Sequence, residues 1–339
     1  MSLEDEIRTK AAELRIHMLG FSPVEKTEYG RIVKERLARG LIPSSVIKST
    51  ECFRIPDTYG NPAESLPGAK TIVCVGGSYL EDNFVPGDVA VRGAIARHYW
   101  RDSYTDLARK RDELLEFIKS RGFKAERAKM HPREAARLTG LAWIGRNALA
   151  INPAYGSWAE YWAIVTDAEI EPTPRLDKSC PKNCRRCMDA CPTKALIEPY
   201  VLDVNRCLNY ILEETGPMSE WARQAVGRRL NGCDTCQEAC PMNKKAKLAP
   251  LPLTAPKPDQ ELVPYPMLER CLDVTQQEMD KNYAYMDWNE PTVRYLVRNA
   301  LVAIGNSGEK DLARLARRHA ESADSLLREQ ARWALEKLA

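Results

Sequence analysis

Strand and helix patterns alternate over residues 1–170, which predicts a domain of the α/β (α+β) class. Two further observations extend this fold class along the chain. Eight cysteines lie between Cys180 and Cys240 with the spacing of bacterial ferredoxins that carry two [4Fe–4S] clusters, and helical patterns run from Asn289 to the end. We therefore expect four parts: an α/β domain over 1–170, a bacterial-ferredoxin-like double-cluster domain over 171–247, a proline-rich connector over 248–288 and a C-terminal helical-repeat (HEAT-like) tail over 289–339.

The first domain begins with two charged segments of helical pattern, residues 3–20 and 26–40, and each segment ends at a glycine. Residues 70–76 then form a short apolar run that is rich in β-branched side chains and bounded by glycines. Such a run is typical of a buried strand. Two helices followed by a central strand are therefore expected here.

The second half of this domain contains a long amphipathic pattern over residues 102–122, which predicts a helix. Its apolar side chains share one face: Leu107, Leu114, Leu115 and Ile118. Two aromatic-rich strand patterns follow within residues 141–166, separated by a turn at 152–156. Helices and strands therefore alternate in this domain.

The cysteines form two runs that each end in the pattern C-x2-C-x3-C-P, before Pro192 and before Pro241. In this pattern the cysteine that precedes the proline binds the other cluster. The rule predicts one ligand set of Cys180, Cys184, Cys187 and Cys240, and a second set of Cys191, Cys207, Cys233 and Cys236. Two such clusters carry single electrons, which limits the expected function to redox chemistry.

Zinc is the alternative occupant, because four thiolates also close a tetrahedral zinc site. Zinc motifs rarely end both runs in x3-C-P, so the spacing favours iron and sulfur. The other three cysteines, Cys52, Cys74 and Cys271, show no ligand spacing. Cys74 lies inside the predicted strand, where a free thiol acts as a small apolar side chain. No function is expected for these three.

The overall composition is that of an ordinary globular protein, with a net charge of +3. No apolar stretch approaches the length of a membrane span, and the acidic N-terminus does not resemble a secretory signal. We therefore expect a cytoplasmic protein that does not enter a membrane. The small net charge neither favours nor excludes a nucleic-acid partner.

The tail contains an approximate repeat, because the segment from Arg298 to Ile304 recurs 34 residues later from Arg332 to Leu338. This favours a HEAT-like repeat, and two unrelated amphipathic helices are the alternative. Several arginines are spaced so that they could share a face: Arg294, Arg298, Arg314, Arg317, Arg318, Arg328 and Arg332. Such a face would either bind RNA phosphates or be an ordinary solvated surface.

Several stretches resemble the epoxyqueuosine reductase family, and together they cover most of residues 60–245. They are Leu66–Val73, Gly93–Arg97 with Arg101, Asp102 and Tyr104, Gly140–Asn147, Gly156–Trp158, Thr166-Asp167 and Cys233–Gln237. The resemblance implies cobalamin as a cofactor beside the two clusters, tRNA as a partner and an external electron donor. It also implies the reduction of epoxyqueuosine to queuosine in the tRNA anticodon loop.

The resemblance also implies where the corrin ring would bind. Its cleft positions correspond here to Gly145, Asn147, Gly156 and Ser157, with Arg97, Trp143, Ile144 and Trp158 beside them. Small residues at a cleft allow a flat ring to approach the backbone. By residue type alone, the tryptophans and the isoleucine are equally typical of strands that pack in a core.

One departure from the family concerns its catalytic aspartate, which lies in a motif of the form Asp-(Ser/Thr)-x-Pro-x-x-Glu-Arg. Lys129 occupies that position here. Opening an epoxide requires a proton for the departing oxygen. We expect His131, Glu134 or Tyr104 to supply it; His131 is the best chemical candidate because histidine titrates near neutral pH, and a plain loop residue is the alternative for His131.

This departure keeps two alternative functions open. One is a related corrinoid and iron–sulfur reductase that acts on a small organic molecule, an organohalide or a corrinoid protein. The other is a ferredoxin-like electron-transfer protein without enzymatic activity. The sequence predicts no oligomeric state.

Overall fold

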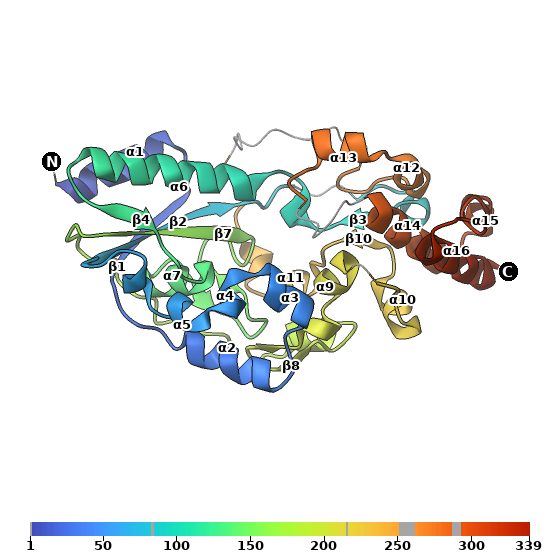
Figure 1. The fold of residues 1–339 in the computed structure, drawn as a ribbon, viewed down its shortest axis with the longest axis horizontal. Helices are drawn as coiled ribbons and strands as arrows, with labels where there is room; N and C mark the ends of the chain where they lie inside the picture. Colours follow the sequence, from blue (N-terminus) through green and yellow to red (C-terminus); the bar gives the residue numbers. More distant parts are fainter. Residues whose placement is uncertain (1, 83–84, 215, 251–261, 287–292) are drawn as a thin grey trace.

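The computed structural model describes residues 2–82, 85–214, 216–250, 262–286 and 293–339 (Figure 1). Its N-terminal half is built on a four-stranded antiparallel sheet with the strand order β1-β2-β7-β4. The elements of this half are α1 Leu3–Glu13, β1 Met18–Pro23, α2 Tyr29–Ala38, α3 Ser44–Ser49, α4 Glu51–Arg54, α5 Pro56–Tyr59, β2 Thr71–Ser78, β3 Ala94–Ile95, α6 Ser103–Ser120, β4 Ala125–Arg127, α7 Pro132–Leu138, β5 Trp143–Ile144, β6 Ala150–Ile151 and β7 Ala159–Thr166.

Strands β2 and β7 form the centre of this sheet and pair along their whole length, from Thr71 opposite Thr166 to Ser78 opposite Ala159. Because successive side chains of a strand point to opposite faces, β2 contributes to two separate cores. Val73 and Val75 pack with the apolar face of α6, whereas Ile72 and Cys74 pack with α7. Helices α1 and α6 therefore cover one face of the sheet, and α7 lies on the other (Figure 1).

The amphipathic helix predicted over 102–122 is confirmed as α6. The Asp102 carboxylate caps its N-terminus by accepting a hydrogen bond of 3.1 Å from the Thr105 backbone N–H. All four predicted core side chains, Leu107, Leu114, Leu115 and Ile118, are buried against the sheet.

The predicted helix over 3–20 is wrong beyond its first part, because α1 ends at Glu13 and Met18–Pro23 is the strand β1. Arg15 has a φ of 55°, which breaks the helix. Strand β1 instead pairs with β2, where Gly20 lies so close to α7 that an added Cβ would be 2.6 Å from the Thr139 carbonyl oxygen. Residues 18–23 are a strand because they pair with β2, which is distant in the sequence, and local periodicity does not indicate such pairing.

The C-terminal half is mostly helical. Its elements are α8 Arg186–Ala190, β8 Leu196–Glu198, β9 Val201–Leu202, α9 Leu208–Glu213, α10 Glu220–Val226, β10 Arg229–Asn231, α11 Thr235–Glu238, α12 Leu268–Asp273, α13 Gln276–Asn282, α14 Val293–Ser307, α15 Ala313–Arg317 and α16 Ser325–Leu338. Strand β3 from the first half pairs in parallel with β10, so residues 94–100 join the core of the second half. Part of the segment expected to be a connector is helical, as α12 and α13, and residues 251–261 of that segment lie outside the described residues.

The tail is helical from α14 to α16, and these two helices pack together in the larger apolar core (Figure 1). A HEAT-like repeat in this tail stays a prediction. None of the helices within the described ranges is long and apolar enough to cross a membrane.

The arginines of the tail do not form one open basic face. Arg294 pairs with Asp324, Arg314 with Glu269 and Arg332 with Glu321. Arg318 pairs in the same way with Asp273. These pairs neutralise most of the charge that a phosphate-binding surface would need.

Arg298 is different, because its side chain is fully buried. Its guanidinium donates hydrogen bonds of 2.8 Å and 3.2 Å to the carbonyl oxygens of Leu212 and Ile211 and one of 2.9 Å to that of Gly216. Burial lowers the pKa of Arg298 to about 10, which leaves it charged at neutral pH. The guanidinium of Arg298 on α14 therefore holds the C-terminal end of α9 through hydrogen bonds to backbone carbonyl groups.

We expect Arg298→Met to lower the free energy of unfolding by about 3 kcal/mol, because it leaves several buried carbonyls without donors. The matched variant Arg317→Met removes an exposed arginine and is expected to change this energy by less than about 0.5 kcal/mol. Anaerobic denaturant titration followed by circular dichroism measures both. Equal effects of the two substitutions would contradict the role of Arg298.

Candidate active site and cluster ligands

A cavity of about 750 Å³ lies between the sheet of the N-terminal half and the cysteine-rich segment. Its wall on the sheet side includes Tyr79, Asn147, Ser157, Glu160 and Tyr161. Its opposite wall contains four cysteines: Cys191, Cys207, Cys233 and Cys236. These four are the second ligand set expected from the sequence, so the structure brings that whole set to one side of one cavity.

Two groups of cysteines affect one another's pKa. Burial raises the pKa of Cys207 to about 11, and the nearby Cys233 and Cys191 add to the rise. Burial likewise raises the pKa of Cys187, to which Cys240, Cys180 and Cys184 contribute. Cys236 interacts with Cys233, Cys207 and Cys191 and also with Cys187, so the two groups adjoin. The division of the eight cysteines into two ligand sets stays a prediction.

All eight cysteines are free thiols in the structure. Across the described part of the chain, no three His, Cys, Asp or Glu side chains converge on the position of a single metal ion. Of the remaining cysteines, Cys74 and Cys271 are fully buried in apolar cores, whereas Cys52 lines the cavity.

The segment from Trp143 to Asn147 connects the first ligand set to the cavity. Trp143 packs against Cys240 and Cys180, and the Arg146 backbone N–H donates a hydrogen bond of 3.4 Å to the Cys180 sulfur. The Arg146 guanidinium also binds the Cys184 carbonyl oxygen at 3.2 Å. At the other end of the segment, Asn147 lines the cavity.

Gly145 lies within this segment, and an added Cβ would be 2.5 Å from Ile151 Cδ1. Ile144, beside it, forms the two-residue strand β5 with Trp143 and pairs with Ala150 of β6. The cavity lining therefore does not include Trp143, Ile144 or Gly145. Trp143 instead packs near the first ligand set, and the other two residues lie beside it in the chain.

The turn at Gly156 and Ser157 is held to the cysteine-rich segment by Asn243. Asn243 Oδ1 accepts a hydrogen bond of 2.8 Å from the Ser157 backbone N–H, and Asn243 Nδ2 donates to Ser157 Oγ at 2.8 Å. Gly156 has a φ of +61°, and a Cβ there would lie 2.1 Å from Asn243 Oδ1. A glycine is required at this position by both its backbone conformation and the close approach.

Arg97 and Trp158 lie behind the cavity. The Arg97 guanidinium sits over the Trp158 ring at 4.9 Å and pairs with Glu238 at 2.9 Å and Asp234 at 3.4 Å. Arg97 lines a smaller depression of about 320 Å³ that also reaches Cys233. Of the eight cleft positions expected from the sequence, Asn147 and Ser157 line the large cavity, and the others support its walls.

The three residues expected to supply a proton occupy different places. His131 lines the cavity, and its Nδ1 accepts a hydrogen bond of 3.3 Å from the Arg133 backbone N–H at the start of α7. Burial, together with Arg133 and Arg36, lowers the pKa of His131 to about 3, so this histidine is neutral at physiological pH. Tyr104 lies at the cavity with an exposed side chain, and Glu134 pairs with Arg137 at 2.8 Å away from the cavity lining.

Sequence reasoning missed Glu160, which lines the cavity together with two other acidic side chains, Glu51 and Asp234. Glu160 is the only acidic residue between Glu134 and Asp167, and it interrupts the otherwise apolar strand β7. A carboxyl group within a buried apolar strand is uncommon, and this was the signal that could have revealed it.

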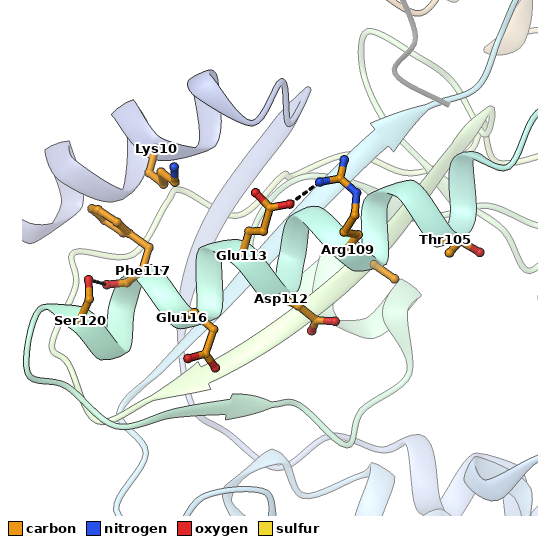
Figure 2. Close-up of a pocket in the computed structure, with 9 residues that line it drawn as sticks. Lys10, Thr105, Arg109, Asp112, Glu113, Glu116, Phe117 and Ser120 are labelled. Atoms are coloured by element: carbon orange, nitrogen blue, oxygen red, sulfur yellow. Dashed lines mark hydrogen bonds and ion pairs between the residues drawn. The ribbon is translucent and has the colours of Figure 1, made fainter. Parts of the chain in front are cut away.

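A second depression, of about 740 Å³, lies on the outer side of α6 (Figure 2). Figure 2 shows the charged side chains of α6 that line it, where Arg109 pairs with Glu113. It contains no cysteine and is open, so it does not offer the enclosed environment that redox chemistry requires.

Residues 180–243 match the family model described as a 4Fe-4S double cluster binding domain. The epoxyqueuosine reductase of Lactococcus garvieae is 31% identical over 350 residues, which cover 99% of this chain and 96% of the relative. That of Xanthomonas campestris is 31% identical and covers 97% of this chain and 94% of the relative. The chain belongs to the epoxyqueuosine reductase family.

Solved structures of epoxyqueuosine reductases share this fold. The Streptococcus thermophilus enzyme is 26% identical, with a TM-score of 0.87 over 100% of this chain and 90% of that one. An epoxyqueuosine reductase with a tRNA-Tyr epoxyqueuosine-modified stem loop is 24% identical, with a TM-score of 0.88 over 99% of this chain and 90% of that one. The mixed α/β architecture with a double-cluster domain is therefore that of the family.

Epoxyqueuosine reductases depend on cobalamin and carry two [4Fe–4S] clusters. The cavity fits a large ring with polar edges. Among the described residues, the buried Asn147 Nδ2 and Tyr161 Oη atoms have no hydrogen-bond partner, although both side chains line the cavity. Unpaired buried polar groups are costly, which favours a site that a polar ligand completes. Ala96, Ala128 and Ala150 leave space beside them.

We expect Cys236→Ala and Cys184→Ala each to lose one cluster, because each removes a thiolate from a different ligand set. Iron analysis of anaerobically purified protein should fall from about eight to about four atoms per chain in each variant. Cys271→Ala, a buried thiol outside both sets, is the control and should keep its iron. A full iron content in either ligand variant would contradict the assignment.

We expect Gly156→Ala to destabilise the protein by more than Gly122→Ala. Both glycines have a positive φ, which costs an alanine about 1–2 kcal/mol, but only Gly156 is in close contact with another residue. Unfolding energies, and cobalamin affinity from visible spectra, measure the difference. Equal losses would show that the contact with Asn243 does not matter.

Proposed function

We propose that this protein reduces the epoxide of epoxyqueuosine in tRNA to give queuosine, as a cobalamin-dependent iron–sulfur enzyme. The observation that carries the proposal is one cavity walled by the four thiols of the second ligand set, in a chain 31% identical to an epoxyqueuosine reductase over nearly its full length. The reaction removes the epoxide oxygen as water, which consumes two electrons and two protons.

Two ligand sets follow from this proposal. Cys191, Cys207, Cys233 and Cys236 hold the cluster nearest the cavity. Cys180, Cys184, Cys187 and Cys240 hold the other, which lies beyond the Trp143–Asn147 segment. Such clusters would pass electrons one at a time from the outer ligand set to the inner one and so to the cavity.

Bound cobalamin would supply a strongly reducing cobalt centre beside the inner cluster. Asn147 and Ser157 would hold the cofactor through polar groups, and Tyr161 offers a hydroxyl without a partner among the described residues. Gly156 and Asn243 fix the turn that presents Ser157. The other five cleft positions expected from the sequence do not line the cavity and support its walls: Arg97, Trp143, Ile144, Gly145 and Trp158.

An external donor is needed, because each turnover consumes two electrons. Lys178, Lys182 and Arg186 are exposed around the outer ligand set. Positive charge near a cluster favours the approach of an acidic partner. We infer that the donor is a negatively charged electron carrier, and that the enzyme meets it and its tRNA in the cytoplasm.

The role of the helical tail is also part of the proposal. We infer that α14 and α16 form a HEAT-like pair that completes the larger core and does not itself provide a broad basic surface. The buried Arg298 and the ion pairs of Arg294 and Arg314 support this view. The tRNA then contacts the enzyme near the mouth of the cavity.

Reconstituted protein with both clusters and cobalamin, given a low-potential reductant, is expected to convert epoxyqueuosine to queuosine in a tRNA stem loop. Mass spectrometry of the released nucleosides measures the loss of one oxygen atom. Protein without cobalamin is the control and should be inactive. A loaded enzyme that binds cobalamin and leaves the tRNA unchanged would refute the tRNA reaction.

A further inference from the structure

The family position for a catalytic aspartate is occupied here by Lys129, which is half exposed and points toward Glu51 at 3.8 Å. No aspartate occurs between Asp112 and Asp167. A lysine ammonium beside Glu51 does not replace a carboxylic acid in the cavity. The proton for the departing oxygen must therefore come from another group that lines the cavity.

Glu160 is a carboxyl group in the required place. It lies on β7, lines the cavity and is 8% exposed. Ser103 at the start of α6 donates a hydrogen bond to Glu160 Oε1. Glu160 Oε2 is buried and has no hydrogen-bond partner among the described residues. A proton on this carboxyl would therefore reside on Oε2.

The surroundings of Glu160 keep it protonated, since no lysine or arginine of the described residues is paired with it. His98 Nδ1 lies 3.6 Å from Oε1, but burial lowers the pKa of His98 to about 4, so the imidazole is neutral. Asp102 and Asp106 face Glu160 from α6, and Tyr79 faces it from the end of β2. Burial and then these two carboxylates raise the pKa of Glu160 to about 8, against the hydrogen bond from Ser103.

The other candidates lack this combination of position and protonation. His131 is neutral, and its Nδ1 already accepts the Arg133 N–H. Glu134 is paired with Arg137 outside the cavity lining. Burial raises the pKa of Tyr161 far above its ordinary value, which makes its hydroxyl a weak acid.

Two other carboxyl groups line the cavity, Asp234 and Glu51. Asp234 pairs with Arg97 at 3.4 Å, and Glu51 accepts a hydrogen bond of 2.9 Å from the Tyr59 hydroxyl. Glu160 differs from both because its buried Oε2 has no hydrogen-bond partner among the described residues.

We propose that Glu160 is the proton donor of this enzyme, and that its carboxyl on β7 replaces the aspartate that the family carries on a different segment. This role rests on the proposed function. As the epoxide C–O bonds break, the external donor would supply the two electrons that the reduction consumes. Glu160 Oε2 gives one proton to the departing oxygen, a second proton comes from solvent, and the oxygen leaves as water. Solvent then reprotonates the Glu160 carboxylate.

The test compares Glu160→Gln with the unmodified protein, both carrying clusters and cobalamin. Glutamine keeps the size of the side chain and the acceptor for Ser103, but it has no acidic proton. General acids contribute roughly 100-fold to 10,000-fold, so turnover should fall by at least about 100-fold. Cobalamin affinity and iron content should stay unchanged. Glu126→Gln, which alters an exposed carboxylate on β4 of the same sheet, should leave turnover unchanged.

Two further measurements separate a proton donor from a structural residue. Turnover of the unmodified enzyme should be full at neutral pH and fall as the pH rises through about 8, and the residual activity of E160Q should lack this limb. Infrared spectra of cobalamin-free protein should contain a protonated carboxyl band at neutral pH that disappears at high pH and is absent from E160Q. This second readout does not depend on activity.

The outcomes distinguish this role from the proposed function. If the unmodified enzyme converts the tRNA and E160Q does so at a similar rate, Glu160 is not the donor. If His131→Gln loses turnover while E160Q keeps it, the acid is His131. If the unmodified enzyme with clusters and cobalamin leaves the tRNA unchanged, the proposed function is wrong, and the role of Glu160 as proton donor is wrong as well. A missing carboxyl band at neutral pH would overturn the role independently.

Discussion

The contact between Asn243 and the Gly156–Ser157 turn joins the two halves of this protein at the point where its chemistry takes place. One amide side chain binds the Ser157 backbone, the Ser157 hydroxyl and the Gln237 carbonyl oxygen. Gln237 lies next to Cys236, and Ser157 lines the cavity. This short hydrogen-bonded link holds the sheet against the cysteine-rich segment, and it has room only because residue 156 has no side chain.

The cavity also contains buried polar groups that have no hydrogen-bond partner within the described part of the chain. Asn147 Nδ2 is one of these groups. A buried polar group that is removed from water and has no hydrogen-bond partner is energetically unfavourable. A bound cofactor with polar edges would satisfy these groups. Removal from water also changes the acids of the cavity: the pKa of Glu160 rises, whereas the pKa values of His98 and His131 fall. Burial therefore selects a carboxylic acid as the proton donor and makes both histidines neutral.

The sheet and the helical core are connected by more than the cysteine-rich segment. Strand β3 leaves the first half and pairs with β10, and Arg97, just after β3, binds Asp234 and Glu238 on and beside α11. These links place Cys233 and Cys236 against the cavity. In the tail, the charges of several arginines are used within the protein, and Arg298 stabilises the core through carbonyl groups. A run of basic residues in a sequence is therefore weak evidence for a binding surface unless their partners are known.

The sequence alone determined the double-cluster domain, because ligand spacing over a few residues is a local property that folding does not alter. It also determined the amphipathic helix α6 and the buried strand β2, whose periodicity is strong and continuous. Tertiary structure decided the rest. Strand β1 exists because β2 pairs with it, and Glu160 became an acid because a strand from one half faces a cavity closed by the other. Neither property can be read from neighbouring residues, since pairing and burial depend on segments far apart in the chain.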